Sequence, residues 1–201
     1  MEPQSLTPLE PGRLYRLGWA IYLTMAVAGI LWIGLRVDGP IPLGLFLDPG
    51  EWWLDVLLGI GSGLLLLGLW SGAEKVFPLA RELERHLAAV LGPLTGSEAF
   101  ALALLSGFAE ELFFRGAVQG QWGFLPATIL FALLHSGPGR AFRFWTLFAA
   151  LAGLLFGGLM LWRGNLLAPV LGHFLVNGIN LRRLARESAR LAAGSESQKE
   201  T

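Results

Sequence analysis

Long apolar segments dominate this sequence, and Pro, Gly or charged residues separate them. About 20 apolar residues are enough to cross the hydrocarbon core of a bilayer as an α-helix. Lipid offers no hydrogen-bond partners, so a backbone that crosses it must satisfy its own polar groups. The sequence therefore predicts an all-α fold, a polytopic transmembrane helical bundle of about six spans. The predicted spans are 17–35, 52–70, 97–119, 124–135, 141–161 and 166–179.

Composition supports the membrane class. Hydrophobic residues make up 54% of the 201 residues and charged residues 15%, whereas a soluble domain usually carries about 25% charged residues. The formal net charge is zero, so bulk charge gives no reason to expect a nucleic-acid partner. The chain has no Cys, which excludes disulfides, thiolate catalysis and Cys-ligated metals. We expect the lipid bilayer to be the main partner of this chain.

The segments outside the spans have different characters. Residues 76–92 place apolar side chains at helical spacing with Arg and Glu between them, which predicts an amphipathic helix in the membrane interface. The polar residues 1–16 are expected to be irregular, and the first apolar run is expected to be an uncut span. Residues 181–193 predict an amphipathic extension, and 194–201 have a disordered composition. We expect one integral membrane domain over 1–201, with a motif-bearing core at 97–180.

The basic residues indicate an orientation for this layout. Twelve of the 15 Lys and Arg residues fall on one predicted side, and only Arg36 and Arg163 fall on the other. Arg115 lies within a span. Cytoplasmic loops carry the excess of Lys and Arg in membrane proteins. We therefore expect both termini in the cytoplasm, with the chain in the inner or plasma membrane of a bacterium.

Three ionisable residues interrupt the third predicted span, namely Glu110, Glu111 and Arg115. A charge at the centre of a membrane helix costs about 2.5–3.5 kcal/mol on insertion scales, so such residues are functional candidates. Glu111 and Arg115 are four apart and can pair on one helix face. Glu110 is rotated by about 100° from Glu111 and needs another partner. Its face also carries Ala103 and Gly107, which would let a neighbouring helix approach closely.

Two further helices contribute polar groups at membrane depth. His135 ends the fourth predicted span, and His173 and Asn177 share one face of the sixth. A packed bundle could bring these groups together around one small wet cavity, because isolated polar groups in lipid would be unsatisfied. A carboxylate among apolar side chains could then act as a base on water. His173 and Asn177 could donate hydrogen bonds to an oxyanion.

Three motifs therefore occur in order on separate predicted helices: Glu110-Glu111-x-x-x-Arg115, Phe131-x-x-x-His135 and His173-x-x-x-Asn177. In these motifs the chain resembles the CPBP intramembrane proteases. That family includes the CAAX prenyl endopeptidases of eukaryotes and bacterial relatives linked to bacteriocin processing and self-immunity, often called the Abi family. The resemblance covers roughly residues 97–180, whereas the N-terminal third matches only as generic hydrophobic helices. No single motif is specific, but the combination of all three is.

The resemblance implies an intramembrane endopeptidase whose cavity opens to the cytosolic side. In this chain Glu110 would be the general base and His135 would help to hold the water. His173 and Asn177 would form the oxyanion site. Structural support would come from Glu111 paired with Arg115, and from Phe131.

The resemblance leaves the metal question open, because the family is often labelled metalloprotease. Two His and one Glu can ligate zinc in a catalytic site, and here the ligands would be Glu110, His135 and His173. We favour a reaction without metal or other cofactor, since Asn177 beside His173 suits oxyanion binding better than zinc ligation.

Two other functions fit parts of the pattern. A non-catalytic immunity or scaffold protein of the same fold would keep the polar cluster for stability. A small proton transporter would use the two glutamates, but it would be expected to show repeat symmetry or broken helices in matched halves, which the sequence lacks. For a protease, the expected partner is a peptide or protein substrate, prenylated if it follows the eukaryotic relatives and otherwise unmodified.

Overall fold

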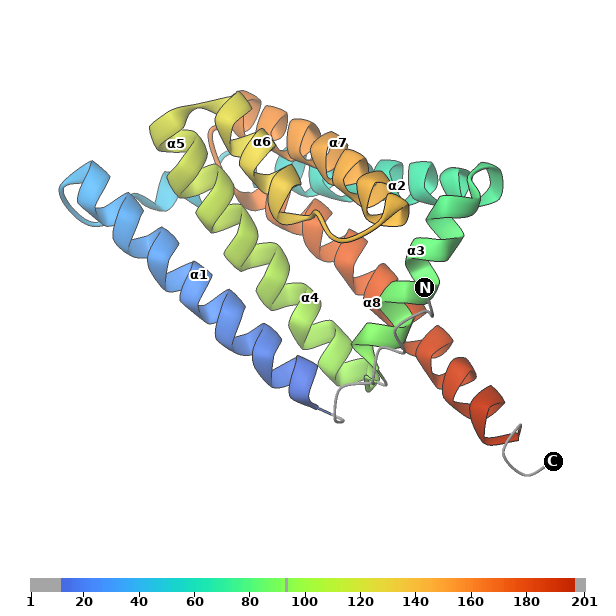
Figure 1. Cartoon of the computed structure of the whole chain (residues 1–201). Coiled ribbons are helices and arrows are strands. Elements are labelled where there is room, and N and C mark those ends of the chain that lie inside the picture. Colours follow the sequence, from blue (N-terminus) through green and yellow to red (C-terminus); the bar gives the residue numbers. More distant parts are fainter. Residues whose placement is uncertain (1–11, 93, 198–201) are drawn as a thin grey trace.

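A computed structural model describes residues 12–92 and 94–197, and every regular element in these ranges is helical (Figure 1). This confirms the predicted all-α class. The elements are α1 (Arg13–Val37), η1 (Leu43–Leu45), α2 (Trp52–Val76), α3 (Pro78–Leu91), α4 (Gly96–Glu111), η2 (Leu112–Val118), α5 (Gln119–Trp122), α6 (Phe124–Leu134), α7 (Arg140–Arg163) and α8 (Leu167–Ser197).

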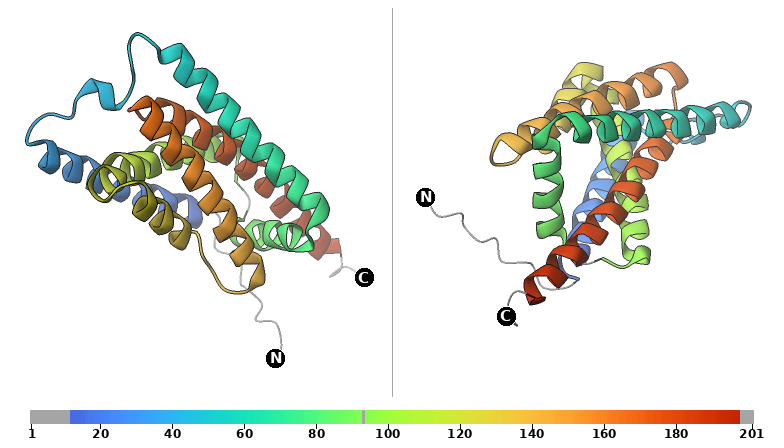
Figure 2. Two further views of the ribbon diagram at one scale, coloured as in Figure 1. Left: turned by 90° about the horizontal axis from the view of Figure 1, so that it is seen from above. Right: turned by 90° about the vertical axis from the view of Figure 1, so that its right-hand side faces the viewer.

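Helix α8 lies at the centre of the bundle. It packs most extensively against α2 and α4, and it also contacts α3 and α7. Helix α1 runs alongside α4 on the outer side and continues along η2, while α6 packs on α7 (Figure 1). Helix α3 leans across the bundle and contacts α2, α7 and α8 (Figure 2). The three motif-bearing elements α4, α6 and α8 thereby surround one interior.

Three helices, α1, α2 and α7, are long and apolar enough to cross a membrane, which makes this an integral membrane protein. A fourth span results if α3 and the segment Gly96–Trp122 are counted together as one bent element, and α6 is a shorter apolar helix. All six predicted spans coincide with helices. That α4, α6 and α8 each cross the bilayer remains a prediction.

The largest differences from the predicted helix ends are at the start of α1 and at the end of α8. Helix α1 begins at Arg13, so residues 13–16 are helical rather than irregular, whereas 1–11 lie outside the described residues. The extension predicted at 181–193 is continuous with α8, which runs to Ser197 and so into the tail predicted to be disordered. Residues 198–201 lie outside the described residues. No proline follows Pro169 in the chain, and the Arg-, Ala- and Leu-rich stretch that follows favours a helix.

The amphipathic helix predicted at 76–92 is present as α3, and its position in the membrane interface stays a prediction. Pro78 occupies its first turn, where a missing backbone N–H costs nothing, and Gly92 ends it with a φ of 68°. Thr95 then caps α4: its hydroxyl accepts from the Glu98 backbone N–H at 3.2 Å, and the Glu98 carboxylate accepts from the Thr95 N–H at 2.8 Å. This reciprocal pair is a capping box.

The helix that carries the glutamates changes its winding directly after them. Residues 112–118 form the π-helical element η2, and the helix then continues to Trp122. The turn predicted at 120–123 is therefore reduced to Gly123, whose φ of 89° a residue with a side chain would rarely adopt. Arg36, at the end of α1, donates to the carbonyl oxygens of Gly116 and Ala117 at 3.1 and 3.0 Å. This contact ties α1 to η2.

Small residues allow α4 and α8 to pack closely, as the spacing of Ala103 and Gly107 predicts. A Cβ added to Gly107 would lie 2.9 Å from the backbone nitrogen of Phe174. One turn away, a Cβ on Gly178 would lie 3.8 Å from the Ala103 side chain. The two helix backbones are therefore near contact at the depth of the glutamates.

A largely buried ionic cluster lies at the end of the bundle opposite α3. Asp55 near the start of α2 is fully buried and accepts from Arg163 Nε at 2.5 Å and from Asn165 Nδ2 at 2.9 Å. Arg163 also contacts Glu51 at 2.8 Å. The cluster fixes the start of α2 to the turn between α7 and α8.

Candidate active site

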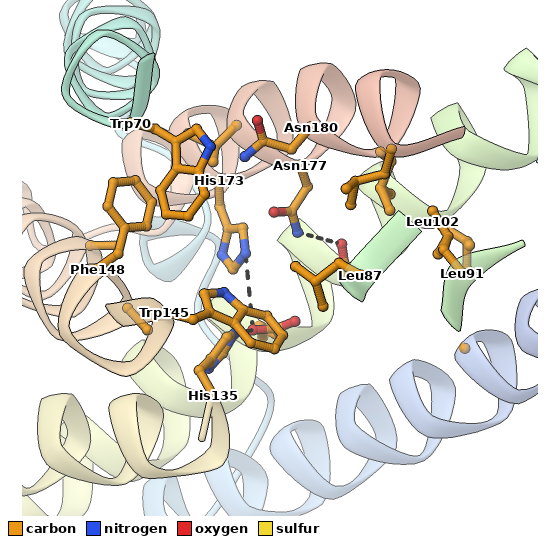
Figure 3. A pocket seen from close by; sticks show the side chains of 18 of the residues that line it. Trp70, Leu87, Leu91, Leu102, His135, Trp145, Phe148, His173, Asn177 and Asn180 are labelled. Carbon is orange, nitrogen blue, oxygen red and sulfur yellow. Dashed lines mark hydrogen bonds and ion pairs between the residues drawn. The ribbon is translucent and has the colours of Figure 1, made fainter. Parts of the chain in front are cut away.

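Four of the predicted site residues, Glu110, His135, His173 and Asn177, line a single cavity of about 440 Å³ (Figure 3). They come from α4, from α8 and from the end of α6, and α1, α2, α3 and α7 supply the remaining walls. The predicted cavity is therefore present, and residues that are far apart in the chain meet in it.

Glu111 lies in a buried cluster beside this cavity. Its side chain is fully buried, and Oε2 contacts Arg115 Nε at 3.1 Å, which confirms the pairing predicted from their spacing. Its other oxygen, Oε1, lies 2.7 Å from His173 Nδ1. Glu111 therefore connects the motif of α4 to the motif of α8, a contact that spacing within one helix does not predict.

Glu110 points in the other direction, into the cavity, as its rotation from Glu111 predicts. Its Oε2 atom lies 3.7 Å from His135 Nε2 and 3.9 Å from His173 Nε2. Both distances exceed a direct hydrogen bond, and a polar contact of this length is commonly bridged by water. One carboxylate oxygen thus faces two imidazole nitrogens from two different helices.

One hydrogen bond orients the His135 ring. Its Nδ1 lies 2.8 Å from the Phe131 carbonyl oxygen, one turn earlier in α6. A carbonyl oxygen only accepts, so Nδ1 carries a proton. The other ring nitrogen, Nε2, therefore points at the Glu110 carboxylate.

The ring of His173 is held on two sides. Nδ1 donates to Glu111, and the ring of Phe156 stacks on the imidazole at 5.6 Å between centroids with an interplanar angle of 17°. A carboxylate that accepts from Nδ1 sets which nitrogen of the ring faces the site. Nε2 of His173 is consequently presented to the cavity.

Aromatic rings surround the Arg115 guanidinium. It lies 4.4 Å from the Phe131 ring centroid, and the rings of Phe114 and Phe156 lie within 6.0 Å. Aromatic faces stabilise a desolvated cation at such distances. Phe131 also packs against the His135 ring at 4.4 Å. Arg115 and Phe131, both expected to be supporting residues, therefore lie together in one aromatic cluster.

Asn177 is oriented by a partner on α4. Its Nδ2 donates to the Ser106 hydroxyl oxygen at 2.8 Å, and the Ser106 hydroxyl in turn donates to the Ala103 carbonyl at 3.2 Å. Figure 3 shows Asn177 on the same side of the cavity as His173, with His135 facing them. The two residues expected to form an oxyanion site thus lie side by side.

The rest of the cavity is mostly apolar, with a few charged side chains in its lining. Leu87, Leu91 and Leu102 line one end and Trp145 and Phe148 the other (Figure 3). Among the charged residues, Glu74 of α2 and Glu84 of α3 lie near Arg183 of α8. Partial burial and the neighbouring charge of Glu74 raise the pKa of the Glu84 carboxyl. An apolar chain with a polar end fits such a lining.

Sequence reasoning missed three residues of this site: Tyr22, Ser106 and Phe156. Tyr22 of α1 lines the same cavity as Glu110. Ser106 holds Asn177, and Phe156 of α7 stacks on His173. Tyr and Phe are ordinary residues of membrane helices, so no sequence signal marks them. Ser106 carries a weak signal, because it lies four residues before Glu110 and so shares its helix face.

The side chains around Glu110 include two imidazoles and a carboxylate, which are ligand types of catalytic zinc sites. Among the described residues, however, no group of three or more His, Cys, Asp and Glu side chains could hold a metal ion. Glu110 Oε2 lies 3.7 Å from His135 Nε2 and 3.9 Å from His173 Nε2, but the three residues do not form such a group.

Fold and site together define a class of protein: a helical integral membrane protein in which carboxylate, imidazole and amide groups from three helices meet in a buried cavity. Residues 93–179 match the family described as type II CAAX prenyl endopeptidase, Rce1-like. This segment includes all three motifs. The resemblance inferred from the motifs is thus confirmed over this part of the chain, which is Rce1-like in sequence.

One curated relative shares part of this sequence. The chain is 35% identical over 91 residues to the uncharacterized protein YpbD of Bacillus subtilis (strain 168). The alignment covers 44% of this chain and 47% of that relative, so the chain spans about half the length of the protein it matches. The comparison with solved structures gave no significant match.

Proposed function

We propose that this protein is an intramembrane endopeptidase that hydrolyses a peptide bond with a water molecule activated by Glu110. The observation that carries the proposal is the position of Glu110 Oε2, which faces Nε2 of both His135 and His173. The match to the CAAX prenyl endopeptidase family supports a protease of this kind.

The acceptors around Glu110 suit a bridging water. Glu110 Oε2 and the neutral His135 Nε2 both accept hydrogen bonds, and 3.7 Å separates them. A water between them would donate one proton to each and keep a lone pair free for the substrate carbonyl. As that lone pair forms the new C–O bond, one water proton passes to Glu110. Glu110 then delivers it to the leaving amine nitrogen when the C–N bond breaks.

The negative charge that develops on the carbonyl oxygen needs donors. Asn177 Nδ2 has a second N–H besides the one given to Ser106. His173, when protonated on both ring nitrogens, would donate from Nε2. Donors that are fixed before the reaction stabilise the transition state without reorganising. The pair therefore fits the proposed oxyanion site.

The proposed substrate is a peptide or protein segment presented at the cytosolic face of the membrane. Most of the side chains that line the cavity are apolar, so a substrate with an apolar portion fits. We also propose that the substrate carries a prenyl group. We further propose that both termini of the protein lie in the cytoplasm of a bacterium.

Cleavage of a reporter peptide library by the purified protein in detergent tests the proposal. We expect Glu110→Gln to lower kcat/KM by about 10²- to 10⁴-fold, the usual contribution of a general base. The matched control is Glu82→Gln on the exposed face of α3, which should retain full activity. Full proteolysis by Glu110→Gln would contradict the assignment of Glu110.

Removal of metal is the second arm of the same experiment. We expect activity to survive treatment with a chelator. Loss of activity that added zinc restores would instead make Glu110, His135 and His173 candidate ligands. No cleavage of any peptide by the parent protein would favour the non-catalytic immunity or scaffold function.

A further inference from the structure

Ser106 is a buried hydroxyl inside a membrane helix that the proposed reaction does not use. Its exposed fraction is 2%, it lines the cavity, and it lies one turn before Glu110 on the same face of α4. A serine in a helix interior can satisfy its hydroxyl simply by donating to a carbonyl one turn back. Ser106 does this with Ala103 O at 3.2 Å, yet it also contacts Asn177.

The two hydrogen bonds of Ser106 run in one direction. Its hydroxyl donates to the Ala103 carbonyl oxygen, which can only accept. With its single proton directed to Ala103, the hydroxyl oxygen accepts from Asn177. The amide presents its NH₂ group to Ser106, at a distance of 2.8 Å.

This contact decides how the Asn177 amide faces the cavity. Ser106 and Glu110 share a helix face, so the donor nitrogen of Asn177 is held on the Glu110 side. One N–H is used by Ser106, and the other is free to donate. A flipped amide would require the Ser106 proton to leave Ala103 O for Asn177 Oδ1, and the N–H donors would then leave the site.

We propose that Ser106 is a positioning residue that locks the amide of Asn177 with its N–H donors toward the substrate carbonyl. This inference rests on the proposed function and adds a residue to it. Ser106 is not a nucleophile in this arrangement, because its proton is bound to the Ala103 carbonyl rather than to a base.

Kinetics of single and double variants test the inference. Ser106→Ala should lower kcat by about 10- to 100-fold with little change in KM, and Asn177→Ala should lower it by about 10²- to 10³-fold, as loss of an oxyanion donor does. In the double variant the two losses should not multiply, because Ser106 acts only through Asn177. Ser106→Cys keeps the volume but offers a weaker acceptor, so it should give an intermediate kcat and provides a second variant if Ser106→Ala does not fold.

Ser62 is a matched control. It is also a buried helical serine, and its hydroxyl donates to the Gly59 carbonyl three residues back at 2.9 Å. It lies in α2 against Gly172 of α8 and is not one of the residues that line the cavity. Ser62→Ala should leave kcat unchanged. Thermal unfolding of both alanine variants, measured in parallel, separates a loss of stability from a loss of positioning.

Three outcomes are decisive. A kcat for Ser106→Ala within threefold of the parent value would overturn the inference. So would losses that multiply in the double variant, since they would mean that Ser106 acts independently of Asn177. In both cases cleavage would still depend on Glu110. If cleavage no longer depends on Glu110, the proposed function fails, whatever Ser106 does.

Discussion

Glu110 and Glu111 are adjacent in the chain but occupy different environments. Glu111 is fully buried between Arg115 and His173, whereas Glu110 faces the cavity and lies near two imidazoles. The rotation of about 100° between successive helical residues produces this division. One carboxylate therefore holds the helices together, and the other is available for chemistry.

The two glutamates should consequently differ in their effect on stability. Glu111→Gln leaves the buried Arg115 guanidinium without its carboxylate, and breaking a buried ion pair costs roughly 3–5 kcal/mol. We expect a clearly lower free energy of unfolding for this variant in a denaturant titration in detergent. The free energy of unfolding of Glu110→Gln should stay close to that of the parent protein.

A double variant distinguishes the pair from its surroundings. Glu111→Gln combined with Arg115→Met removes both charges and keeps similar volumes, so part of the lost stability should return. If the double variant is less stable than Glu111→Gln alone, the aromatic cluster around Arg115 contributes more than the ion pair does.

Residue spacing predicted the Glu111–Arg115 pair because both partners lie on one helix. It could not predict that Glu111 also binds His173, which lies 62 residues further along the chain. Spacing likewise placed His173 and Asn177 on one face but did not reveal that Ser106 orients Asn177. These contacts depend on how α4 is rotated against α8.

At the scale of elements, the close approach of α4 and α8 brings the motifs together. Gly107 is the contact point, since a Cβ there would meet backbone atoms of Phe174 that cannot move without shifting α8. Glu110 lies three residues beyond Gly107, so the separation of the two helices sets the distance from Glu110 to His173.

Gly107→Ala should therefore reduce both stability and activity. Overpacking at a tight contact costs about 1–3 kcal/mol, and pushing α8 outward separates the catalytic groups. The matched control is Gly158→Ala on α7, where nothing lies within 4 Å of an added Cβ. We expect a lower unfolding midpoint and lower kcat for the first variant and parent values for the second. Equal behaviour of the two variants would contradict the close contact.

The π-helical winding of η2 was beyond prediction from sequence. Patterns of apolar residues indicate a helix but do not separate α from π geometry over one or two turns. Such insertions are often found at functional sites, and here the winding changes directly after Glu111. Arg36 supports the altered segment from α1, a contact between residues about 80 positions apart.

At the scale of the whole molecule, the distribution of basic residues predicts the orientation in the membrane. The chain has no native cysteine, so single cysteines can report on each side. Two exposed positions form a matched pair. Ala189→Cys lies on α8, on the predicted cytoplasmic side, and Leu43→Cys lies in the loop between α1 and α2, on the other predicted side. In intact cells a membrane-impermeant maleimide should label Leu43→Cys alone, and permeabilised cells should show labelling of both. The reverse pattern would contradict cytoplasmic termini.

The sequence predicted the helical membrane class, the approximate helix positions, the amphipathic helix that became α3 and the identity of the main polar residues. It did so because lipid permits few backbone structures and tolerates few buried charges, which makes both easy to recognise. It was less accurate at helix ends, since α1 and α8 continue past the polar residues that were expected to end them.

Only the tertiary structure decided which polar groups share a cavity and which are buried beside it. It brought Glu110 toward His135 and His173, joined Glu111 to His173, oriented Asn177 through Ser106 and added Tyr22 and Phe156 from α1 and α7. The physical reason is that each of these arrangements depends on the separation and rotation of packed helices. Periodicity along one helix shows which residues share a face, but the neighbour that this face meets is set by packing across the bundle.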